Sequence, residues 1–188
     1  MECGKIEDVC TCKSAILQIE HIYIVDLKGA TGAGGIEAYD EEQEYESLLL
    51  RNLDHIPVRL VAFEENAFKV RRCYYAKQCE CVVYPEPSLE NSWLLFVEMK
   101  YAKNENNIEC EGWHKKAVEQ IRSTVGFLKQ NGTISSDKKL NAIVSFPKLS
   151  AFSSWLTQYI QNELEPDNII ARCTNAATII DDQILILA

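Results

Sequence analysis

The stretch QCECVVYPEPSLENSWLLFVEMK, residues 78–100, decides the fold because it holds two strand-forming runs joined by a short connection. Val, Tyr, Phe and Trp favour strands over Glu80–Tyr84 and Trp93–Tyr101, and the intervening PEPSLENS favours a turn. Parallel neighbours need a crossover of about a dozen residues or more, so a connection this short joins antiparallel strands. We therefore predict an antiparallel hairpin at the centre of a sheet.

Side-chain alternation gives this hairpin one charged end. In WLLFVEMK, Glu98 and Lys100 share one face at the end of an apolar run, roughly 7 Å apart at their Cα atoms. In QCECVVY, Glu80 lies on the same face as Val82 and Tyr84. Folding the hairpin brings Glu80 opposite Glu98 and Lys100. Burying unpaired charges next to an apolar run costs free energy, so a function is expected to account for these side chains.

The rest of the chain predicts one α/β domain with a central mixed β-sheet flanked by helices. The helix over residues 111–130 has apolar side chains at helical spacing and Asn131-Gly132 as a stop signal. It can return the chain for a neighbouring strand at residues 141–146, parallel to the hairpin's second strand. Further strands are expected at 15–27, 58–63, 67–75, near 169 and at 178–187, and further helices at 36–53 (with an acidic first half) and 150–164.

Metal-assisted phosphodiester hydrolysis is one reason for the charged cluster. Carboxylates such as Glu80 and Glu98 bind Mg²⁺, a hard ion that prefers oxygen ligands. The ion lowers the pKa of a bound water and neutralises charge that grows on the phosphate. A lysine at position 100 can orient that water or stabilise the developing charge.

In this order of elements the chain resembles the PD-(D/E)XK, or restriction-endonuclease-like, superfamily over about residues 36–147. The resemblance rests on an acidic first helix, Glu80 on the second core strand, Glu98-Met99-Lys100 on the third, the helix with AVEQI and the strand NAIVSF. It implies a nuclease dependent on Mg²⁺ or Mn²⁺, with Glu80 and Glu98 as ligands, Lys100 as the catalytic lysine and Gln120 in support. The family's first acid is usually Asp, often after Pro, whereas here Glu80 follows Cys79.

Two rival interpretations stay open. The same scaffold could serve as a non-catalytic binding or regulatory module within a nucleic-acid-processing or defence assembly, or the chain could be an unrelated α/β protein with a coincidental E-x-K. Glu98 and Lys100 could be an exposed ion pair at a strand end, and Gln120 an ordinary helix-surface amide. His114, near a helix start, is expected to be solvated.

Length and hydrophobicity limit the class of protein. The 188 residues, 47% hydrophobic, suit a single domain over residues 1–188. Residues 1–35 are expected to add a strand and a Gly-rich turn to the core at 36–147, and residues 148–188 a helix and strands. No apolar run reaches the roughly 20 residues that span a bilayer, and the acidic N-terminus is unlike a secretory signal, so a cytoplasmic protein without membrane contact is expected.

The predicted partners are nucleic acid and, in a homodimer or larger assembly, further protein chains. The net charge of −9 disfavours non-specific binding to phosphate by the whole molecule. Positive charge is nevertheless local, at Lys69, Arg71 and Arg72 and again at Lys115 and Lys116.

The chain contains eight cysteines, a high count for its length. The two C-x-C pairs, Cys10 with Cys12 and Cys79 with Cys81, do not have the C-x(2–4)-C spacing of structural zinc sites. We therefore expect reduced, metal-free thiols, some buried as small apolar side chains.

GATGAGG, residues 29–35, lacks the lysine of a phosphate-binding loop and is expected to be a linker.

Overall fold

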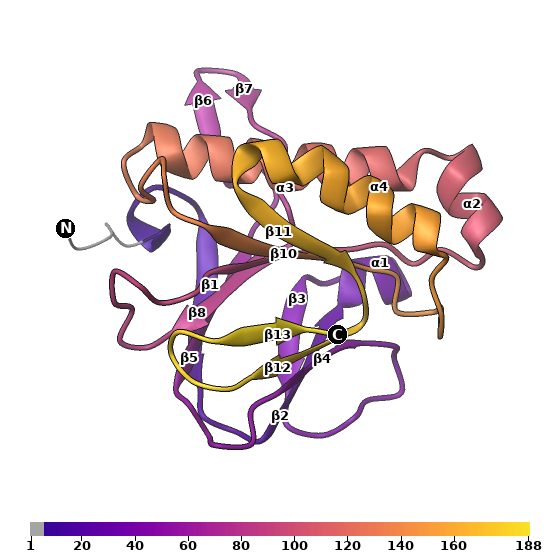
Figure 1. The fold of residues 1–188 in the computed structure, drawn as a ribbon. Coiled ribbons are helices and arrows are strands. Elements are labelled where there is room, and N and C mark those ends of the chain that lie inside the picture. Colours follow the sequence, from indigo (N-terminus) through magenta and orange to yellow (C-terminus); the bar gives the residue numbers. More distant parts are fainter. Residues whose placement is uncertain (1–5) are drawn as a thin grey trace.

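The structure is a computed structural model that describes residues 6–188, which form an α/β protein with two mixed β-sheets and four α-helices (Figure 1). The larger sheet has the strand order β1-β5-β8-β9-β10-β11. Its strands are β1 (Cys12–Leu17), β5 (Val58–Phe63), β8 (Cys81–Pro85), β9 (Leu95–Met99), β10 (Leu140–Ser145) and β11 (Ile169–Cys173).

The predicted hairpin is confirmed. Strands β8 and β9 are antiparallel neighbours in the middle of the larger sheet, with Cys81 opposite Val97. Strand β10 lies parallel to β9 on its other side, with Val144 opposite Glu98. The helix α3 (Trp113–Gln130) supplies the crossover between them, as its apolar stripe predicts, although it begins at Trp113 and follows a separate short helix, α2 (Glu105–Cys110).

The smaller sheet has the order β13-β12-β4-β2-β3. It unites β2 (His21–Asp26), β3 (Ile36–Tyr39) and β4 (Leu48–Arg51) with β12 (Ala176–Ile179) and β13 (Leu185–Leu187). The single strand predicted at 15–27 is two strands, because β1 pairs with β5 whereas β2 pairs with β3 and β4 of the smaller sheet.

The helix predicted over residues 36–53 is wrong, because this segment forms β3, β4 and the loop between them. Its glutamates favour a helix, but Leu48 and Leu50 alternate with more exposed neighbours and are fully buried. A strand lets both leucines enter the apolar core between the two sheets. Local helix propensity is only a weak preference, and this tertiary packing outweighs it. Likewise, the strand predicted at 67–75 is a small ribbon of β6 (Lys69–Arg71) and β7 (Tyr74–Tyr75).

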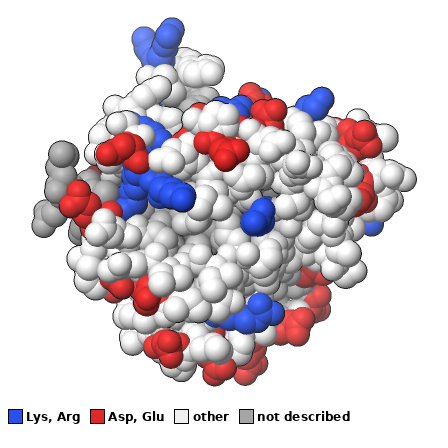
Figure 2. All heavy atoms as spheres, viewed as in Figure 1, with Lys and Arg blue, Asp and Glu red and all other residues white. Residues whose placement is uncertain are grey.

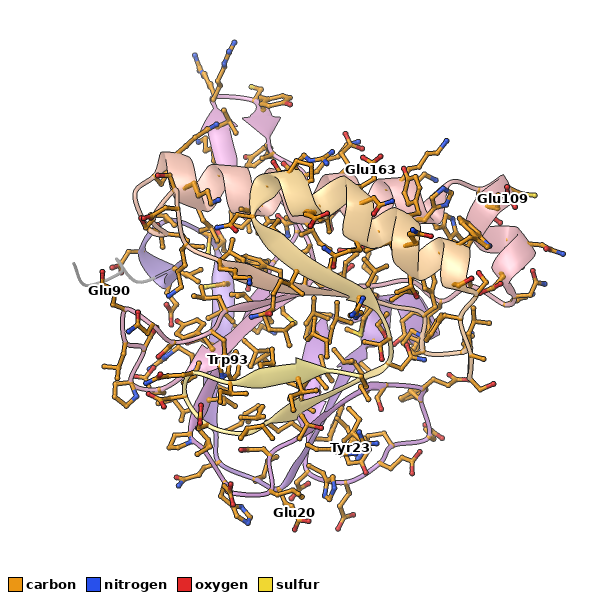
Figure 3. The ribbon with its side chains drawn as sticks, viewed as in Figure 1. Glu20, Tyr23, Glu90, Trp93, Glu109 and Glu163 are labelled. Atoms are coloured by element: carbon orange, nitrogen blue, oxygen red, sulfur yellow. The ribbon has the colours of Figure 1, made fainter. Side chains whose placement is uncertain are left out.

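Helices cover one face of the larger sheet and the smaller sheet covers the other. Val82 and Phe96 point into the core beneath α3 and α4 (Ser154–Leu164), whereas Val83 and Leu95 point into the core between the sheets. Trp93 also lies between the sheets, where its indole N–H donates to the carbonyl of Asp181 at 2.9 Å (Figure 3). The alternation predicted for the hairpin therefore decides which layer each side chain enters.

The fourth helix, α1 (Leu27–Thr31), follows β2 directly and ends at Gly32, which adopts a positive φ of 89°. Residues 29–31 of the segment expected to be a linker therefore belong to this helix, and the rest of the segment connects it to β3. No helix within residues 6–188 combines the length and the apolar character needed to cross a membrane.

Candidate functional site

The β8–β9 register places Glu80 and Glu98 at one end of the hairpin. Glu80 immediately precedes β8, and its backbone N–H donates to the carbonyl of Val97 at 3.0 Å. Glu98 is the next residue of β9, and Lys100 follows the end of that strand, its N–H donating to the carbonyl of Ser145. The structure thus brings three of the four candidate side chains to one end of the two central strands.

Glu98 is a fully buried carboxyl group rather than part of an exposed pair. Its Oε1 forms an ion pair with the ammonium of Lys100, while its Oε2 has no hydrogen-bond partner. Burial raises the pKa of Glu98, the Lys100 ammonium lowers it by less, and Glu80 and Asp26 raise it further. For Lys100, burial lowers the pKa, but the negative charges of Glu98, Glu80 and Asp26 together outweigh burial and the net shift is upward.

Glu80 is half-buried and titrates near neutrality. Burial is the largest cause, followed by the negative charge of Asp26, and together they raise the pKa of Glu80 to about 7 despite the ammonium groups of Lys100 and Lys28. A carboxyl group in this state can hold or release a proton at neutral pH, as a general base must.

Asp26 is the residue that sequence reasoning missed. It ends β2 in the smaller sheet and is buried, and its charge raises the pKa of both Glu80 and Glu98. Tyr101 supports it, since its hydroxyl accepts the Asp26 N–H at 3.3 Å and donates to the carbonyl of Glu46 at 3.2 Å. The available signal was an acid at the end of the apolar run HIYIVD, the same signal that identified Glu98.

A cleft of about 900 Å³ reaches Glu80 and Asp26, whereas Glu98 and Lys100 are not among the residues that line it. Asp26 and Glu80 line it from the sheets, and Gln120 lines it from α3. Four lysines also line it, together with acidic side chains: Lys13, Lys28, Lys77 and Lys116 with Glu37, Glu64, Glu65 and Glu119. The walls are therefore of mixed charge, and the fully buried Glu98 is not part of them.

Gln120 acts through the backbone next to Glu80. Its Nε2 donates to the carbonyl of Gln78 at 2.8 Å, and Thr124, one turn further along α3, accepts the N–H of Cys79 at 2.8 Å. These two bonds fix the segment that leads into Glu80, so Gln120 is a positioning residue and not a free surface amide. They also turn Cys79 toward α3, although strand alternation predicts the opposite face for it, because regular pairing starts only at Cys81.

The donor set fits a hard divalent cation in its chemistry. Glu80 and Glu98 supply carboxylate oxygens, and the buried Oε2 of Glu98 lacks any partner. Within residues 6–188 no three His, Cys, Asp or Glu side chains are grouped so that they could hold a metal ion. Mg²⁺ commonly binds through one or two carboxylates and keeps several waters, so a pair of glutamates is sufficient for it.

The cysteines and His114 are the other titratable candidates, and Cys79 and Cys81 flank Glu80. The cysteines of the described chain are free thiols: Cys79, Cys81 and Cys173 are buried, Cys73 and Cys110 are exposed, Cys10 and Cys12 lie between these extremes, and Cys3 falls outside the described residues. The expectation that His114 is solvated is wrong. Its ring is buried edge-on between Trp155 and Tyr159, and Nδ1 lies 3.1 Å from the carbonyl of Ile108.

Comparison of the chain with protein-family models, with curated proteins and with solved structures gives no match.

Proposed function

We propose that this chain is a nuclease domain of the PD-(D/E)XK type that hydrolyses phosphodiester bonds with the help of Mg²⁺ or Mn²⁺. The observation that carries the proposal is the buried Glu98, whose Oε2 has no partner while Lys100 holds its Oε1, next to a glutamate that titrates near pH 7. The order β5-β8-β9-β10, antiparallel and then parallel after α3, supports the restriction-endonuclease-like fold.

The side chains divide the work by their environments. Glu80 and Glu98 would hold the cation, which when bound would acidify a water and neutralise charge on the phosphate. Glu80 faces the cleft and can accept a proton at neutral pH. Lys100 keeps a positive charge at the end of β9, where it stabilises negative charge on the phosphate in the transition state. Gln120 keeps Glu80 in place through Gln78.

A binding or regulatory module without catalysis is the second candidate. The ion pair of Glu98 with Lys100 favours it, because the lysine already neutralises the carboxylate that the cation would need. The net charge of −9 and the glutamate at position 80 point the same way. This candidate predicts no cleavage and little effect of divalent cations on stability.

Thermal unfolding with increasing Mg²⁺ or Mn²⁺ tests the proposal. A cation that binds only the folded chain raises the melting temperature with its concentration. Glu98→Gln keeps the shape but removes a charge, so it should abolish the shift. Lys100→Ala should retain or strengthen it, because a competing cation is gone, and should lose any cleavage of labelled DNA or RNA.

Glu90→Gln is the matched control, since Glu90 is an exposed glutamate outside the cleft. It should leave both the cation-dependent shift and the cleavage unchanged. Calorimetry that detects no binding of millimolar Mg²⁺ or Mn²⁺ to the wild-type chain would refute the catalytic proposal and leave the binding module.

A further inference from the structure

We propose that the β6–β7 ribbon is an arm that binds single-stranded nucleic acid and leads it into the cleft. This inference rests on the proposed nuclease function and names the form of its substrate. The arm comprises residues 69–75, KVRRCYY, and all seven side chains are exposed. It projects beyond α3 at the top of Figure 1, away from the packed layers.

The arm concentrates unpaired positive charge on an acidic protein. Lys69, Arg71 and Arg72 make no ion pair within the described part of the chain, and Lys and Arg gather at the projecting tip in Figure 2. In the cleft, by contrast, Lys28 pairs with Glu65 and Lys77 with Glu119. Because the chain carries a net charge of −9, the arm is the part of it that best complements a phosphate backbone.

The arm also exposes two aromatic rings. Tyr74 and Tyr75 are 62% and 41% exposed, although most large apolar residues of this protein are buried. Stacking of a nucleic-acid base on an exposed phenol ring is energetically favourable. Paired bases in a duplex are already stacked on each other and hide their faces, so these rings select an unpaired strand. Cations and stacking platforms side by side form a surface for single strands.

The arm leads directly to the candidate site. Tyr75 lines the cleft, and the chain continues along the cleft wall through Lys77 and Gln78 to Glu80. A strand stacked on Tyr75 therefore has a continuous path to the carboxyl cluster. Only the four residues 76–79 separate Tyr75 from Glu80 along the chain.

The base of the arm is rigidly anchored. Phe68, immediately before β6, is fully buried and stacks on Phe127 of α3 with the ring centroids 4.6 Å apart. Its carbonyl accepts the N–H of Ala76, which closes the ribbon at 2.9 Å. Gln78 accepts the N–H of Ala67 at 2.8 Å, so both ends of the ribbon are fixed. The base of the arm is thus fixed beside the cleft, which Tyr75 lines.

Fluorescence anisotropy in chelator, where cleavage cannot occur, tests the arm separately from catalysis. The probes are oligodeoxythymidine, oligouridine, a DNA duplex and polyglutamate. We expect both single strands to bind and the duplex to bind more weakly. Arg71→Ser/Arg72→Ser should lower the slope of log affinity against log salt by about 1.4, since each single-strand phosphate contact contributes about 0.7. Arg51→Ser/Arg172→Ser, a matched loss of two exposed arginines outside the cleft, should leave the slope unchanged.

The tyrosines give a second, charge-independent readout. Tyr74→Ala should weaken single-strand binding about five-fold or more, whereas Tyr74→Phe keeps the ring and should bind like the wild type. Equal affinity for the duplex, equal affinity for polyglutamate, or unchanged binding by the arginine and tyrosine variants would each overturn the inference. Divalent cation is then added to compare cleavage. If the arm variants bind and cleave like the wild type, the arm is refuted and the proposed nuclease stands. If binding depends on the arm but no cleavage occurs, the arm is supported and only the proposed nuclease is refuted.

Discussion

In chelator, the free energy of unfolding should fall as the pH rises from about 5 to about 8, and Glu80 should cause a measurable part of that fall. The pKa of Glu80 is about 7 in the folded chain, against 4.5 for an unperturbed glutamate. Between these two values the folded chain keeps a proton that the unfolded chain has lost. Stabilisation from this group is therefore complete below the unfolded pKa and is lost as the pH passes the folded pKa. Glu98 contributes in the same direction, because burial raises its pKa as well.

The magnitude follows from the distance between the two pKa values. The shift from 4.5 to about 7 corresponds to about 3 kcal/mol, at about 1.4 kcal/mol per pH unit. Because Glu80 is only half-buried, solvent screens part of this effect, and we expect about 2 kcal/mol. Glu80→Gln cannot ionise, so the pH profile of this variant should be flatter than that of the wild type by that amount.

Urea unfolding at a series of pH values measures the effect, with Glu90→Gln as the control that should reproduce the wild-type profile. Mg²⁺ or Mn²⁺ should restore the lost stability at high pH, because a bound cation favours the ionised carboxylates. Parallel pH profiles for wild type and Glu80→Gln would show that Glu80 is ordinary and solvated, and would contradict the description of the site.

Two further changes test the packing around the cluster. Gly29→Ala should destabilise the chain by about 1–3 kcal/mol in urea unfolding, since the added Cβ would lie 2.3 Å from Oδ2 of Asp26. Gly126 is a helical glycine at which an added Cβ would meet no atom within 4 Å, so Gly126→Ala should instead stabilise the chain by about 0.5–1 kcal/mol. Lys100→Met leaves the buried Glu98 without its cation and should cost about 3 kcal/mol at neutral pH. The double variant with Glu98→Gln should regain much of that loss. A double variant no more stable than Lys100→Met would contradict the buried pair.

The sequence by itself determined the central hairpin and the faces of its strands. The short connection at residues 85–92 allows only antiparallel neighbours, and alternation along WLLFVEMK places Glu98 on the same face as Phe96. Only the structure shows that this face meets the helices. The stripe of α3 likewise predicts the crossover to β10. These features could be read because they depend on residues close together in the chain, where local periodicity and turn chemistry are sufficient.

Tertiary structure decided the second sheet and the third carboxyl group. Residues 36–51 have helical propensity, but pairing of β4 with β2 and with β12, more than a hundred residues away, makes them strands. The same pairing carries Asp26 to the cluster, and Gln120 finds its partner at the carbonyl of Gln78. No local pattern records such contacts, because strand pairing joins distant segments and its free energy comes from the surface they bury together.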